Sequence, residues 1–87
     1  MPKFLIERDI PDAGQLTPEQ LLAISSSSCR TLRGMDPEVQ WITSFVTADK
    51  IYCIYIAPDE EVIRRNAFEG GFPANTITLI QNTIAPA

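Results

Sequence analysis

Residues 51–57, with the sequence IYCIYIA, are apolar or aromatic at every position. A strand with one face in water alternates polar and apolar residues, so this unbroken run predicts a strand that is covered on both faces. The chain has 87 residues, and a chain of that length leaves much of its surface exposed and has a marginal core of its own. Whatever covers the second face of this strand therefore constrains both the fold and the assembly.

Three other segments predict strands from their composition and their boundaries. They are residues 3–9, 38–46 and 76–84, and a hairpin turn at 47–50 leads into the apolar run. Side chains alternate between the two faces of a strand, which places Glu7 and Asp9 on one face of the first strand. The second strand is expected to present Val39, Trp41, Thr43 and Phe45 on one face.

Two segments predict helices. The sequence TPEQ at 17–20 forms a capping-box start for a helix that continues to Gly34. Asp59 is expected to cap a second helix, which ends at the glycine pair 70–71. The order of elements is therefore β-α-β-β-α-β, which predicts a single ferredoxin-like α+β domain over residues 1–87.

In this fold, both helices pack on one face of a four-stranded antiparallel sheet whose first and third strands are central. The third strand here is the apolar run, which suits a central position. Because two helices cover only one face of the sheet, the other face predicts an interface with a second copy, related by a two-fold axis, in a dimeric α/β barrel. The alternative is a monomer covered by its own C-terminal segment, for which the tail APA is too short.

Composition excludes several classes of function. The net charge is −4 and the basic residues are scattered, which argues against a nucleic-acid partner. The sequence has neither an apolar stretch of transmembrane length nor a signal peptide, so we expect no membrane association and a cytoplasmic protein with free thiols at Cys29 and Cys53. The absence of histidine removes the usual general base and the commonest nitrogen ligand for metals.

Two residues of the central strands are candidates for chemistry. Glu7 is expected to be half-buried, so its carboxylate needs a partner. Arg8 lies on the opposite face, which leaves Arg64, Tyr55 or a ligand, and a structural salt bridge or hydrogen bond is the simpler interpretation. Cys53 is interpreted as a structural thiol, because burial in an apolar strand raises the pKa of a thiol.

Four stretches, taken together, resemble one protein family. They are KFLIERDIP at 3–11, WITSFVTADKIYCIY at 41–55, APDEE at 57–61 and GGFPA at 70–74. In this order and spacing they are similar to the nickel-responsive small-protein family, over residues 3 to about 80. The resemblance implies a ferredoxin-like dimeric α/β barrel and no established enzymatic activity, and one branch of the family implies nickel binding.

This sequence departs from the family's pattern at potential metal ligands. Where relatives carry His or Glu, it has Thr43, Ile56 and Asn66. Nickel prefers imidazole or thiolate ligands, so nickel binding is not carried over from the resemblance. The weak metal candidates that remain are Glu7, Asp9 and Cys53.

The leading hypothesis is a non-catalytic, cytoplasmic homodimer that binds a small ligand and needs no cofactor. The candidate pocket consists of Glu7, Trp41, Thr43, Cys53, Tyr55 and Asn66. One alternative is binding of nickel or another divalent metal in a metal-stress response. A second alternative is a small α/β-barrel enzyme of monooxygenase or isomerase type, which rests on fold analogy alone.

Overall fold

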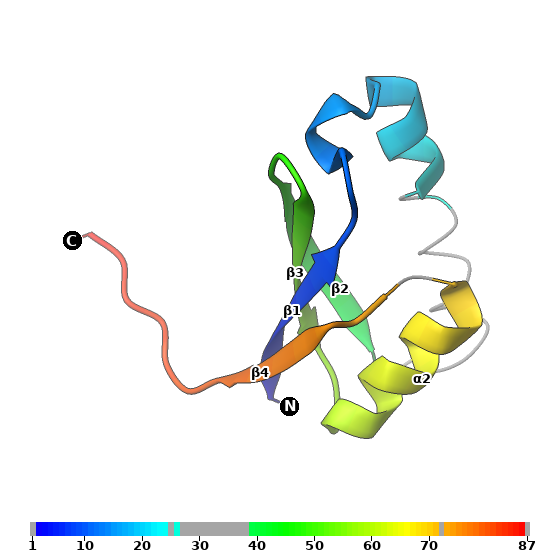
Figure 1. Ribbon diagram of the computed structural model, residues 1–87. Coiled ribbons are helices and arrows are strands. Elements are labelled where there is room, and N and C mark those ends of the chain that lie inside the picture. The colour runs from blue at the N-terminus through cyan, green and yellow to red at the C-terminus, as the bar shows by residue number, and fades with distance from the viewer. Residues whose placement is uncertain (1, 25, 27–38, 72, 87) are drawn as a thin grey trace.

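The computed structural model describes residues 2–24, 26, 39–71 and 73–86. Four strands form one antiparallel sheet in the order β2-β3-β1-β4 (Figure 1). Their bounds are β1 Lys3–Asp9, β2 Gln40–Val46, β3 Lys50–Ile56 and β4 Thr76–Ile80. The apolar run is therefore central, as predicted, and the strand order confirms the α+β class with ferredoxin-like topology.

The first helical segment comprises residues 18–24 and 26, and it follows the 3-10 turn η1 (Ala13–Gln15). Its predicted capping box is confirmed, because Thr17 N–H donates to Gln20 Oε1 at 2.9 Å and Gln20 N–H donates to Thr17 Oγ1 at 3.2 Å. The predicted helix end at Gly34 and the thiol of Cys29 lie outside the described residues.

Helix α2 (Glu60–Gly70) has both predicted boundaries. The Asp59 carboxylate accepts a hydrogen bond from Val62 N–H at 2.9 Å, which satisfies a free donor of the first turn. The helix stops at Gly71, whose φ of 73° lies in the left-handed region that favours glycine. In the described part of the chain, no helix is both long and apolar enough to cross a membrane.

The core lies between the sheet and α2. On β1 and β3 buried side chains alternate with half-buried ones, and the buried set faces the helix. Ile6 of β1 and Ile63 of α2 have no exposed surface. The other strand residues of this core are Phe4, Ile51, Cys53 and Tyr55.

A β-bulge in β2 changes which side chains share a face. Trp41 pairs with Tyr55, whereas Thr43 pairs with Ile54, the next residue back along β3. The extra residue, Ile42, therefore turns Trp41 and Thr43 to opposite faces of the sheet. The prediction that Trp41 shares one face with Thr43 and Phe45 is wrong for this reason.

Strand β4 is shorter than predicted. It ends at Ile80 rather than at residue 84, because Ile80 pairs with Lys3, the first residue of β1. Among the described residues, no strand continues beside β4 past this pair, so further backbone has no ladder to join. Residues 81–86 are exposed and belong to no helix or strand.

The face of the sheet opposite α2 is called here the open face. Directly paired residues point the same way, so the pairs Leu5–Ile54 and Glu7–Tyr52 lie on it together. Its apolar members are Leu5, Phe45, Tyr52, Ile54, Ile56 and Ile80. Phe45 is 57% exposed and the other five are half-buried, so this apolar face lacks a cover within the described chain.

Candidate functional site

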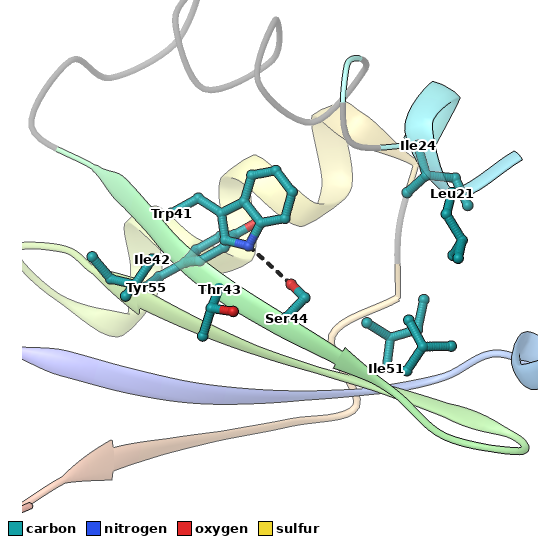
Figure 2. A pocket seen from close by; sticks show the side chains of 9 residues that line it. Leu21, Ile24, Trp41, Ile42, Thr43, Ser44, Ile51 and Tyr55 are labelled. Carbon is teal, nitrogen blue, oxygen red and sulfur yellow. Dashed lines mark hydrogen bonds between the residues drawn. The ribbon is translucent and has the colours of Figure 1, made fainter. Parts of the chain in front are cut away.

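A cavity of about 410 Å³ lies on the helix side of the sheet, at the β2 edge. Figure 2 shows Trp41 and Tyr55 at one end of it and Leu21, Ile24 and Ile51 at the other. Small-molecule sites typically have volumes of about 300–1,000 Å³, so the cavity is large enough for a small organic ligand. Its described lining residues are Leu21, Ile24, Trp41, Ile42, Thr43, Ser44, Val46, Ile51 and Tyr55.

A hydrogen-bonded chain fixes the wall of the cavity at Trp41. The indole N–H of Trp41 donates to Ser44 Oγ at 2.9 Å, and the Ser44 hydroxyl donates to Cys53 Sγ at 3.0 Å (Figure 2 shows the first bond). The bulge makes this possible, because it places Trp41 and Ser44 on the face that Cys53 occupies. The aromatic wall is thus held in one orientation, and a hydroxyl oxygen lies beside it.

The structure does not bring the six candidate pocket residues together. Trp41, Thr43 and Tyr55 line the cavity, and Cys53 lies next to it as the acceptor for Ser44. Glu7 points to the open face, where it pairs with Tyr52, so it lies on the other side of the sheet from the cavity. Asn66 is buried on α2 and is not among the residues that line the cavity.

Glu7 has a different neighbour from those that the sequence suggested. Its carboxylate lies 3.7 Å from Lys50 Nζ, and the carboxylate of Asp9 lies at the same distance from that amine. The candidates Arg64 and Tyr55 are not involved, because Tyr55 is on the helix side and Arg64 pairs with Glu60 on α2. The simpler interpretation of Glu7, a structural ion pair, fits this geometry, although the pair is partly exposed and weak.

The ammonium of Lys50 has a pKa raised above its usual 10.5, chiefly by the charge of Asp9, then by Tyr52 and Glu7. A raised pKa in the folded state means that the protonated amine stabilises the fold at pH values below about 10.5. We therefore expect a small loss of stability as the pH rises through the pKa of the folded state. In urea titrations between pH 8 and 11.5, Lys50→Met removes this component; an unchanged alkaline loss in that variant contradicts the assignment.

Sequence reasoning missed the burial of Arg8, which is 5% exposed. Its Nη1 donates to the carbonyl oxygen of Pro73 at 2.7 Å, and its Cζ lies 5.9 Å from the centroid of the Tyr55 ring. A signal was available, because Arg8 has the same strand parity as Phe4 and Ile6. The guanidinium therefore lies over the Tyr55 ring and links β1 to the segment before β4.

Asn66 is the second residue whose state the sequence did not reveal. Its side chain is 5% exposed, and neither Nδ2 nor Oδ1 has a hydrogen-bond partner in the described structure. An unpaired buried amide is destabilising, because it loses its hydrogen bonds to water without replacement. An apolar residue at position 66 would therefore make the folded protein more stable than asparagine does.

The strand order β2-β3-β1-β4 defines a small α+β domain of ferredoxin-like topology. This domain has a cavity on the helix side of its sheet and an apolar open face on the other side. The family model for nickel-responsive proteins of the SCO4226-like type matches residues 4–80, and the chain belongs to this family. A solved structure with the same fold is that of SCO4226 from Streptomyces coelicolor A3(2). It is 17% identical, with a TM-score of 0.80 over 94% of this chain and 99% of that one. A search of curated proteins finds no match.

The family's description raises the question of whether the residues present could hold nickel. Nickel binds best to imidazole and thiolate, and this chain has no histidine. Of the weak candidates, Glu7 and Asp9 are neighbours of the Lys50 ammonium on the open face, whereas Cys53 is on the other face. Among the described residues, no three His, Cys, Asp or Glu side chains group around a metal position. This donor set does not fit a nickel ion.

Proposed function

We propose that this protein is a non-catalytic homodimer that binds a small, largely apolar ligand in the cavity beside Trp41. The cavity itself is the observation that carries the proposal, because its volume and its two aromatic residues are those of a small-molecule site. The hydroxyl group of Ser44, which lies beside Trp41, supplies a polar contact that orients a ligand.

Binding rather than catalysis is favoured by the character of the cavity wall. The described lining residues include no Asp, Glu, Lys, Arg or His. General acid–base catalysis near neutral pH needs a group whose pKa lies near the working pH, within reach of the substrate. An apolar wall with two aromatic rings instead suits a flat or branched apolar molecule.

The test uses Trp41, which is the single tryptophan of the chain. A library of small aromatic compounds is screened by thermal shift, and the hits are titrated while Trp41 fluorescence is followed. Leu21 lines the cavity and Leu22, its neighbour in sequence, is 68% exposed and does not. We expect Leu21→Glu to weaken binding by at least about tenfold, because a charge in an apolar site costs more than 1.4 kcal/mol.

The matched control is Leu22→Glu, which adds the same charge one residue away and is expected to bind as the wild type does. Glu7→Gln is a second control, because Glu7 lies on the other face of the sheet. Equal binding by Leu21→Glu and Leu22→Glu places the ligand elsewhere, and the absence of any hit from the library contradicts the proposed function.

The second part of the proposal is that the open face is the interface of the homodimer. Six apolar residues gather there, and a two-fold axis lets the same face of another copy cover them. The two stacked sheets would complete the α/β barrel, and burial of this surface would add the stability that a chain of this size lacks. A cytoplasmic location belongs to the same proposal, and the buried free thiol of Cys53 is compatible with it.

Nickel binding is the second candidate function, and membership of the nickel-responsive family is the observation that favours it. The described donors do not fit the ion, so a site would need groups from outside the described residues. Elemental analysis of untagged protein, loaded with nickel and then desalted, decides between the two: about one equivalent per chain supports nickel binding, and less than about a tenth contradicts it.

A further inference from the structure

Residues 81–86, called here the arm, follow β4 and lie apart from the core. All six are exposed, and Ile84 is 95% exposed. Figure 1 shows the arm leaving the end of β4 on the side of the sheet opposite α2. A single exposed isoleucine is ordinary on a protein surface, so the position of the arm is more informative than this one exposure.

Strand parity relates the arm to the open face. Ile80 pairs with Lys3 and lies on the open face, as Thr78 does opposite Leu5. In an extended chain every second residue points the same way, so an arm that continued β4 in extended form would place Ile84 on the side of the open face. The arm would then carry one large apolar side chain past the end of β1, beside the open face.

The charges of the open face indicate what covers it. A two-fold axis parallel to the strands places β1 of one copy over β3 of the other, because these two strands are central neighbours in the order β2-β3-β1-β4. Glu7 and Asp9, at the end of β1, then lie over Lys50, at the start of β3 of the second copy. Lys50 already lies 3.7 Å from Glu7 and from Asp9 of its own chain, so the axis brings two such ion-paired clusters together with opposite charges in register, which is the self-complementarity that a two-fold interface requires.

The same axis places the β4 edge of one copy next to the β2 edge of the other. The arm starts at that edge, so it leaves one sheet where the second copy begins. It also continues past the last pair of its own sheet, and apart from the local bond from Thr83 N–H to Asn82 Oδ1 its described backbone is open to a neighbour.

We propose that the arm, residues 81–86, packs against a second copy of this chain, with Ile84 as its apolar anchor. The inference rests on the proposed homodimer, and symmetry makes the exchange reciprocal, so each copy holds the arm of the other. The contact of each arm with the other copy then slows dissociation of the dimer, while the open faces provide the larger part of the interface.

The test measures the dimer dissociation constant of the full chain by sedimentation across a dilution series. Ile84→Asp is expected to raise the constant by roughly tenfold, because it replaces an apolar anchor with a charge. Thr83→Asp is the matched control, since it adds the same charge on the other side of an extended arm, and it is expected to leave the constant nearly unchanged. A photo-reactive amino acid at position 84 is expected to cross-link two chains.

The outcomes separate the arm from the dimer. One outcome is a dimeric wild type whose dissociation constant is the same as those of Ile84→Asp and Thr83→Asp. In that case the arm does not contact the second copy, and the inference is wrong although the dimer exists. Cross-links only within one chain overturn it in the same way. A wild type that is monomeric at tens of micromolar overturns both the proposed dimer and the arm.

Discussion

Ile54→Asp is expected to convert the proposed homodimer into monomers, with a dissociation constant at least about 100-fold higher than that of the wild type. Ile54 lies at the centre of the open face, between Leu5 of β1 and Thr43 of β2. A carboxylate at this position would be buried in the dimer without a partner, whereas in a monomer it reaches water. The penalty therefore falls on association and not on folding of the single chain.

Phe68→Asp is the matched control for this experiment. Phe68 is on α2 and is 85% exposed, so the substitution adds the same charge to an exposed apolar position away from the open face. Both variants are checked for folding by circular dichroism and compared by sedimentation. A folded Ile54→Asp chain that dimerises as tightly as Phe68→Asp contradicts the assignment of the open face as the interface.

Asn66→Leu is expected to raise the free energy of unfolding by about 1–3 kcal/mol. The two polar atoms of Asn66 are buried and unpaired in the described structure, and leucine has a similar shape without the desolvation penalty. Leucine also has the higher helix propensity, which acts in the same direction within α2. Urea denaturation of the ligand-free protein gives the difference.

Asn66→Asp is the comparison for that measurement, because it keeps the shape and adds a charge at a buried position. We expect this variant to be less stable than the wild type. If Asn66→Leu is also destabilised by more than about 1 kcal/mol, the amide makes hydrogen bonds that stabilise the fold, and its description as unpaired is wrong.

The topology was predictable because local signals and the hydrophobic pattern agree. The capping box at Thr17 and Gln20, the Asp59 cap and the stop at Gly71 are each confirmed by hydrogen bonds or a backbone angle. These are short-range features, and they depend on residues within three or four positions of one another. The apolar run of β3 added the long-range information, because only a central strand needs cover on both faces.

The composition of the site was less predictable, because it depends on register. One extra residue in β2, Ile42, moves Trp41 and Thr43 to opposite faces, and no residue type in the sequence marks a bulge there. The ion-pair partner of Glu7 also depends on which strands are neighbours, because Lys50 lies on β3, which pairs with β1. Burial of Arg8 was readable from parity, yet its bond to Pro73 joins positions 65 residues apart.

Native mass spectrometry of the untagged protein, purified from its own source, reports both the proposed homodimer and its bound ligand in one spectrum. We expect ions of two 9.7 kDa chains that carry additional mass from a bound small molecule, and loss of that mass in Leu21→Glu but not in Leu22→Glu. Ions of a single bare chain, at concentrations where the protein is folded, would show that neither the homodimer nor the bound ligand exists.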